Sequence, residues 1–259
     1  MNSVFIVSLT LLSSMFMAQA SSVNADPATI SPESEQILEL VNHTRAGAGA
    51  SPVQWDAALA ETARQHGMRM AADGSAEHHY TGEPNISERA GQSGAHFSLI
   101  GEEVAVGSTP AGIHEEWMKS PDSRANLLNP QMDRIGVAVI ASDADLYAVV
   151  EFERAVPVLT QTQVEATIGG LLQRSGITIL HDATAARAIC VTDKPLSGAE
   201  TGRHPGFVLR WQDPDMTHLP PMLAKLINTP RYSEAEVGSC PAQDVKGPFT
   251  AYRVAVLLY

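Results

Sequence analysis

The sequence predicts an α+β fold in which helices come first and a β-hairpin follows. Apolar residues recur at helical spacing in the two segments that follow Ser31 and Asp56. Two strand-like runs, 135–141 and 146–152, are then joined by the turn-prone residues 142–145. The charge pattern also changes near Pro157, which divides the chain into two halves.

The first two helices carry clear start signals. Ser31 is followed by Pro32, an N-cap residue and a favoured first helical residue, and Gly47 ends this helix. Asp56 caps the second helix because its carboxylate can accept from the first free backbone N–H groups. The apolar side chains that define the faces of these two helices are Ile37, Leu38, Val41, Leu59, Ala63 and Met70.

The following stretch has little periodicity. Residues 74–100 are rich in glycine and histidine and predict a long surface loop with one helical turn near Ser87. Thr109 and Pro110 then start a third helix, in which Ile113 and Trp117 share one face.

The second half predicts a separate α+β unit. A helix is expected over 160–174, strands over 206–211 and 250–258, and a short helix over 220–228. No internal repeat is evident, and this half carries no catalytic signature.

The charge is unevenly distributed over 259 residues with a net charge of −12. Residues 26–156 hold 8 basic and 20 acidic residues, whereas residues 157–259 hold 9 of each. The whole net charge therefore belongs to the first half. An acidic protein is a poor partner for a phosphate backbone, so nucleic acid is excluded as a partner.

The first twenty residues are typical of an export signal. An apolar run ends in Ala18-Gln19-Ala20, a small-x-small cleavage pattern, so we expect a signal peptide over 1–20 and a linker over 21–30. The run is too short to span a bilayer, so we expect no transmembrane segment in the mature chain. The predicted location is secreted or periplasmic, where Cys190 and Cys240 are expected to form a disulfide.

The first half also contains one cluster of residues that suits metal or acid–base chemistry. His78, Glu102 and His114 stand out, since imidazole and carboxylate are zinc ligands and a carboxylate beside a histidine can raise its pKa. The alternative is a solvated acidic face or a buried structural pair. No serine-nucleophile, metalloprotease or phosphate-loop motif is present.

The order of segments from Ile37 to Phe152 resembles a CAP domain, the superfamily of cysteine-rich secretory, antigen-five and pathogenesis-related proteins, in its short bacterial form. The matching segments are ILELVNHTRAGAG, AALAETARQHGMRMA, HHYTGEPNISERAGQSG, GEEVAVG, IHEEWMKSPDSRANLLNP, DRIGVAVI and LYAVVEFE. The resemblance implies an α-β-α sandwich with a central antiparallel sheet over 31–156, followed by a small α+β domain of unknown function over 157–259.

The resemblance also assigns a His/Glu cleft. His78 matches the first histidine of the family and Glu102 its glutamate, with Glu103 where asparagine is usual. Ser123 replaces the second histidine of the Ser-Pro-x-His-Arg segment. His78 and Glu102 alone give at most two metal ligands, so we expect only a weakly bound divalent cation such as zinc, unless His114 turns toward the cleft.

Three functions follow as hypotheses. The leading one is a non-enzymatic extracellular or envelope binding protein, with lipid or sterol as the ligand class that the resemblance suggests. The second is a metal-assisted hydrolase of peptide or cell-wall material, with Glu102 as base and His78 as ligand or acid. The third is an adhesion or protein-interaction module formed by the second half.

Overall fold

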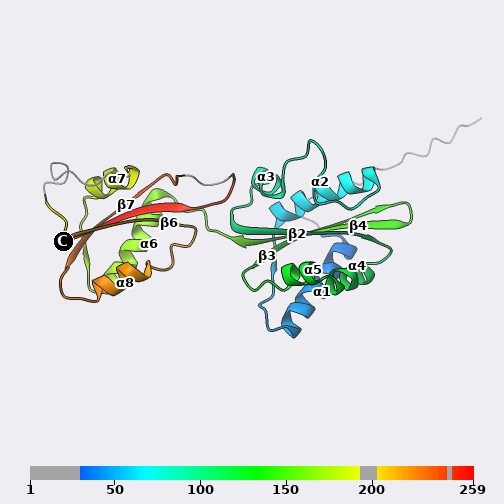
Figure 1. Cartoon of the computed structure of the whole chain (residues 1–259), viewed down its shortest axis with the longest axis horizontal. Helices are drawn as coiled ribbons and strands as arrows, with labels where there is room; N and C mark the ends of the chain where they lie inside the picture. Colours follow the sequence, from blue (N-terminus) through cyan, green and yellow to red (C-terminus); the bar gives the residue numbers. More distant parts are fainter. Residues whose placement is uncertain (1–29, 193–202, 244–246) are drawn as a thin grey trace, which may run out of the picture.

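The computed structural model describes residues 30–192, 203–243 and 247–259, and shows two units along the long axis of the molecule (Figure 1). Each unit has its own four-stranded sheet and its own apolar core. The predicted signal peptide over 1–20 and almost all of the predicted linker lie outside the described residues.

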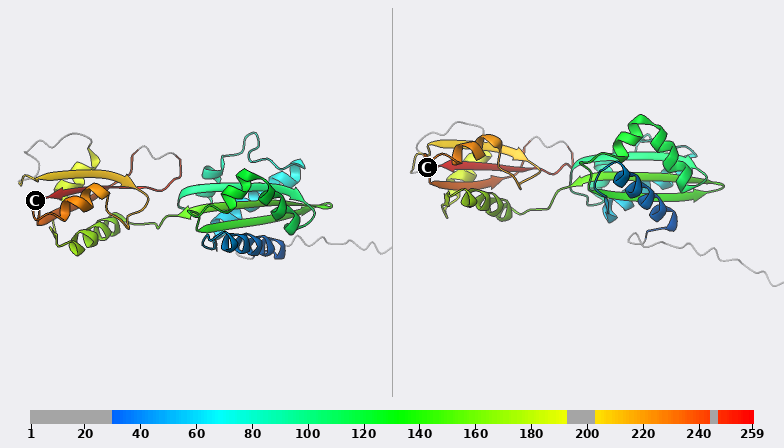
Figure 2. Two further views of the ribbon diagram at one scale, coloured as in Figure 1. Left: turned by 60° about the horizontal axis from the view of Figure 1, so that its bottom comes forward. Right: turned by 90° about the horizontal axis from the view of Figure 1, so that it is seen from below.

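The first unit is an α-β-α sandwich, as predicted. Its sheet has the order β1-β3-β4-β2, in which β1 and β3 are parallel and the other neighbours are antiparallel. Helices α2 and α3 cover one face, and α1, α4 and α5 cover the other (Figures 1 and 2). The elements are α1 (Pro32–Gly47), β1 (Gln54–Trp55), α2 (Ala57–Asp73), α3 (Ile86–Gln92), β2 (Phe97–Gly107), α4 (Pro110–Lys119), α5 (Pro121–Leu127), β3 (Arg134–Ser142) and β4 (Asp145–Ala155).

The predicted helix starts of this unit are confirmed by their caps. The Ser31 hydroxyl accepts from the backbone N–H of Ser34, and one Asp56 carboxylate oxygen accepts from two N–H groups in the first turn of α2. Thr109 caps α4 in the same way. The predicted hairpin is also confirmed, and its turn contains Asp143 with a positive φ of 53°.

The predicted helical turn near Ser87 is confirmed, because residues 86–92 form α3, which starts with a capping box at Asn85. The predicted loop over 74–100 is wrong at its end, because β2 begins at Phe97. The strand escaped prediction because Glu102 and Glu103 are adjacent, point to opposite faces and interrupt the apolar alternation of an ordinary strand.

The helices of the first unit pack on the two faces through different residues. The face under α1 and α4 is apolar, with Val137 and Val150 of the sheet against Ile37, Ile113 and other helical side chains. On the other face the backbone of α2 lies directly on Gly136. A Cβ there would lie 2.2 Å from the backbone nitrogen of Ala60, so any larger residue would push the helix away.

The second unit has the same three layers. Its sheet order is β5-β7-β8-β6, with α7 on one face and α6 and α8 on the other (Figure 1). The predicted strands and helices near 160–174, 206–211, 220–228 and 250–258 are present, whereas β5, α7 and β7 were not predicted. The elements are α6 (Gln161–Arg174), β5 (Thr178–Ile179), α7 (Thr184–Val191), β6 (Phe207–Asp213), α8 (Pro221–Ile227), β7 (Glu234–Cys240) and β8 (Tyr252–Leu258).

The two units share one topology, although no repeat is evident in the sequence. In both, a helix leads to a two-residue strand that pairs in parallel with the third strand, and the last two strands form a hairpin. The backbone bonds correspond: Gln54 N–H donates to Asp133, and Thr178 N–H donates to Ser233. In both units the backbone of a helix packs directly on a glycine of the third strand. In the second unit this glycine is Gly238, where a Cβ would lie 2.3 Å from the backbone nitrogen of Arg187 in α7.

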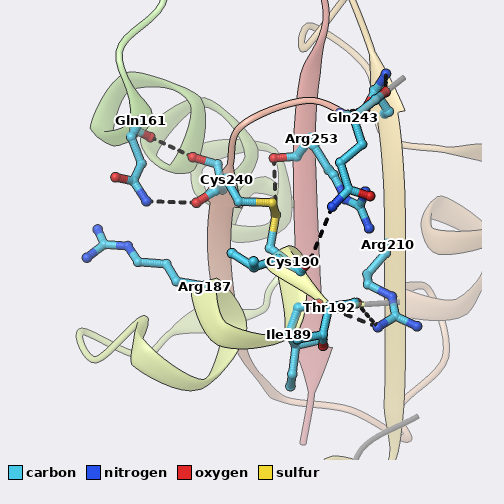
Figure 3. The surroundings of a disulfide bond; sticks show 12 residues. Gln161, Arg187, Ile189, Cys190, Thr192, Arg210, Cys240, Gln243 and Arg253 are labelled. Atoms are coloured by element: carbon cyan, nitrogen blue, oxygen red, sulfur yellow. Dashed lines mark hydrogen bonds between the residues drawn. A yellow bond between two sulfur atoms is a disulfide. The ribbon is translucent and has the colours of Figure 1, made fainter. Parts of the chain in front are cut away.

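The predicted disulfide between Cys190 and Cys240 is confirmed (Figure 3). It joins the end of α7 to the end of β7, so it fixes the helix that covers one face of the second sheet. The surrounding cluster is apolar and contains Ala186, Ala255 and Leu257.

Candidate functional site

The candidate site is built around Glu102 on β2. Its direct neighbour across the sheet is Glu151 on β4, so both side chains point toward the layer of α2 and α3. Both are buried, with 4% and 0% of the side chain exposed. Two adjacent carboxyls removed from water require positive or hydrogen-bonding partners.

His78 supplies one such partner at the surface. Its Nδ1 lies 2.9 Å from Oε1 of Glu102, while 63% of its side chain is exposed. The hydrogen bond to Glu102 raises the pKa of His78, and burial opposes it only in part. His79 is directed elsewhere, because its Nε2 donates to the main-chain oxygen of Glu83 at 2.8 Å.

Arg89 on α3 supplies the second partner. Its Nη2 bonds to Oε2 of Glu102, and its Nη1 donates to the main-chain oxygen of Pro84 at 3.1 Å. The same guanidinium lies 3.7 Å from Glu83 and 3.8 Å from Glu151. One buried cation is therefore shared among three carboxyl groups.

His66 on α2 completes the inner part of the site. Its Nε2 lies 2.9 Å from the main-chain oxygen of Glu77, and its Nδ1 lies 2.7 Å from Oε1 of Glu83. A carbonyl can only accept, so Nε2 carries a hydrogen. The contact between Nδ1 and Glu83 is also of hydrogen-bond length, so both ring nitrogens have a partner inside the protein.

We refer to His66, Glu83, Arg89, Glu102 and Glu151 as the buried charge cluster. Burial raises the pKa of Glu151 well above its usual value, the charge of Glu102 raises it further, and Arg89 opposes both. Neither carboxyl oxygen of Glu151 has a hydrogen-bond partner among the described residues. These surroundings favour the neutral acid at this position.

Comparison with known proteins identifies the first unit. The model of the CAP family, described as "Cysteine-rich secretory protein family", matches residues 38–152. The first unit is a CAP domain. The uncharacterized protein YkwD of Bacillus subtilis strain 168 is 29% identical over 117 residues, which cover 45% of this chain and 46% of that protein. The chain thus spans about half the length of the curated relative that it matches.

Solved structures are similar at lower identity. An extracellular protein containing an SCP domain from Bacillus anthracis is 24% identical, with a TM-score of 0.44, over 49% of this chain and 44% of that one. The structure named Na-ASP-1 is 10% identical, with a TM-score of 0.44, over 91% of each chain.

Among the described helices of this protein, none has the length and apolar character needed to cross a bilayer.

The CAP domain holds the other two sequence candidates in different places. Ser123 lies in the first turn of α5, one turn before Asn126, whose side chain donates to the main-chain oxygen of Glu102 at 3.2 Å. His114 points toward α1, where its Nε2 donates to the hydroxyl of Thr44 at 3.2 Å. Burial lowers the pKa of His114, and the structure does not bring this side chain to Glu102.

A closed zinc site does not fit these residues. Structural and catalytic zinc requires at least three protein ligands. No three His, Cys, Asp or Glu side chains within residues 30–192, 203–243 and 247–259 are grouped closely enough to hold a metal ion. His78 offers one exposed nitrogen, and both oxygens of Glu102 already accept hydrogen bonds.

Sequence reasoning missed four members of the buried charge cluster. His66, Glu83, Arg89 and Glu151 come from α2, the following loop, α3 and β4. One usable signal was present, because Glu151 is the only charged residue in the predicted strand over 146–152. A charge in such a run is buried only with a partner.

Proposed function

We propose that this protein is exported and acts as a non-enzymatic binding protein, with His78 and Glu102 of the CAP domain as the contact point. The observation that carries the proposal is the hydrogen bond between Nδ1 of His78 and Glu102. It fixes the ring and leaves Nε2 as the group that faces solvent. The export signal over 1–20 and the disulfide support an extracellular location.

The arrangement favours binding over hydrolysis. A general base needs a carboxylate oxygen that can take a proton from water, but each oxygen of Glu102 already accepts from Arg89 or His78. A divalent cation at this point would be held by one imidazole nitrogen, with Glu102 orienting the ring from behind. Such a contact is weak.

Zinc titration tests the contact point. Calorimetry of the full chain should show weak binding that His78→Ala removes and His79→Ala leaves unchanged. Equal zinc affinity in the parent protein and in His78→Ala would refute the proposed contact.

The pH dependence provides a second test. Because the pKa of His78 is raised, a cation must displace a proton from the ring at mildly acidic pH. We therefore expect zinc affinity to rise as pH increases through the His78 pKa. An affinity that is constant from about pH 5.5 to about pH 8 would exclude this ring as the ligand.

A lipid ligand is a second candidate, and one observation favours it. The second unit contains a cavity of ≈ 270 Å³ with mainly apolar lining, close to the lower size limit of small-molecule sites. Organic extraction of the purified protein should release lipid, and bulky substitution at Val164 in the cavity wall should reduce the amount. Protein that contains no lipid and takes up no labelled lipid would refute this candidate.

A further inference from the structure

The connection between β7 and β8 reaches from the second unit to the CAP domain. In Figure 1 it extends toward the start of β2. The backbone N–H of Thr250 donates to the main-chain oxygen of Phe97 at 2.9 Å. Since β2 is an edge strand of the first sheet, this bond occupies an otherwise unpaired edge group.

Two side chains of the same connection pack on the CAP domain. The ring of Phe249 meets the fully buried ring of Phe97 edge-on, with 4.9 Å between centroids. Pro248 lies directly on Gly91, so close that a Cβ on Gly91 would be 2.3 Å from the Cβ of Pro248. We call residues 247–251 the clamp.

The clamp contacts the helix that carries Arg89. Helix α3 has seven residues, with Arg89 two positions before Gly91. A helix of this length is not stable by itself and depends on tertiary packing. That packing comes from a small cluster in which Ala90 contacts Leu59 and Phe97, and Phe249 closes it from the second unit.

The position of α3 in turn sets the charge beside Glu102. Arg89 is bonded to Glu102, and among the described residues no other lysine or arginine pairs with this carboxyl, whose remaining basic neighbours are His66 and His78. A small displacement of α3 would carry the guanidinium away from Glu102. Arg89 would then no longer neutralise the charge of Glu102, and the loss of one positive charge from the site would favour a cation on Nε2 of His78.

We propose that the clamp of the second unit holds α3, and thereby Arg89, against Glu102, so that docking of the second unit controls ligand binding at His78. The effect on ligand binding rests on the function proposed above, whereas the effect on α3 does not. The second unit thus regulates the CAP domain through one edge strand and one short helix.

Hydrogen exchange measured on the full chain tests the clamp without any ligand. Phe249→Ala removes the aromatic contact, and Gly91→Ala forces the helix away from Pro248. Both should reduce protection of the α3 amides at least about tenfold while α1 and β8 keep theirs. Gly47→Ala is the matched control, because a Cβ there meets no atom within 4 Å. Unchanged α3 protection in both variants would overturn the proposal.

Zinc titration then tests the link to the site. Phe249→Ala should bind zinc about three- to tenfold more tightly than the parent protein, and Phe249→Leu, which keeps an apolar contact, should lie between them. In an Arg89→Met background, Phe249→Ala should have no further effect. A full effect of Phe249→Ala in that background would refute control through Arg89. If the parent protein binds no zinc, the proposed contact point fails, and the exchange result still decides whether the clamp holds α3.

Discussion

Glu153 offers a direct test of the electrostatics of the CAP domain. This residue of β4 is 2% exposed, and its Oε2 has no partner among the described residues. Burial, helped by the charges of Asp56 and Asp133 and opposed by that of Arg134, raises its pKa to about 8. The folded protein therefore keeps this proton to a higher pH than the unfolded chain does. Stability from this group is fully present below about pH 4.5 and is lost as pH rises toward 8.

The size of the effect follows from the shift. Raising a carboxyl pKa from 4.5 to about 8, at about 1.4 kcal/mol per unit, corresponds to about 5 kcal/mol at alkaline pH. Local relaxation and water entry reduce the penalty, so we expect Glu153→Gln to stabilise the protein by about 2–4 kcal/mol at about pH 8.5. Near pH 5 the substitution should change stability little, because Glu153 is then neutral.

Urea unfolding between about pH 5 and about pH 8.5 measures this difference. The variant should lose part of the pH dependence of the parent protein, and Glu151, His78 and His114, whose pKa values are also shifted, contribute to the remainder. Glu39→Gln, at an exposed position of α1, serves as the control and should leave the pH dependence unchanged. Parallel stability curves for the parent and Glu153→Gln would refute the reasoning.

Two further predictions concern packing. Arg45 is fully buried and donates to the main-chain oxygens of Ser51, Leu127, Asn129 and Met132, so Arg45→Met should cost about 3–5 kcal/mol in urea unfolding. Arg64→Met, which breaks an exposed ion pair with Glu61 within α2, should lower the free energy of unfolding by less than about 1 kcal/mol. Equal losses of stability in Arg45→Met and Arg64→Met would contradict this account. Gly238→Ala should lower the stability of the second unit by about 1–3 kcal/mol because its Cβ would enter the backbone of α7. The same change at Gly170, where the nearest atom is the end of the Arg174 side chain at 3.7 Å, should have little effect on thermal unfolding.

Local signals predicted much of the fold. The caps at Ser31, Asp56 and Thr109 are short-range features, since each side chain bonds to backbone two or three residues away. The disulfide was also predictable, because the sequence contains only two cysteines and its first twenty residues predict export.

The buried charge cluster was much harder to predict. His66 lies within an amphipathic helix and Arg89 within a short one, and neither position signals burial beside a carboxyl. Only the pairing of β2 with β4 brings Glu102 and Glu151 together, and strand pairing is a long-range property.

The shared topology of the two units could not be predicted from the sequence, because their side chains differ while their backbone pairing is the same. Aligning the two sheets by their pairing places Val208 and Leu257 where the CAP domain has Glu102 and Glu151. At these two positions the second unit is apolar, and a disulfide lies in the same layer, so the pair of carboxyls that would mark a repeat is not kept.

The parallel pairing of β1 with β3 has a consequence for the order of folding. Gln54 cannot find its partner Arg134 until most of the CAP domain has been synthesised, so closing this sheet requires a long and entropically costly loop. Once Ala155 has emerged, however, every strand of the first sheet is present, whereas Phe249 follows almost a hundred residues later. The nascent chain thus completes the first sheet well before the contact between Phe249 and the α3 region can form.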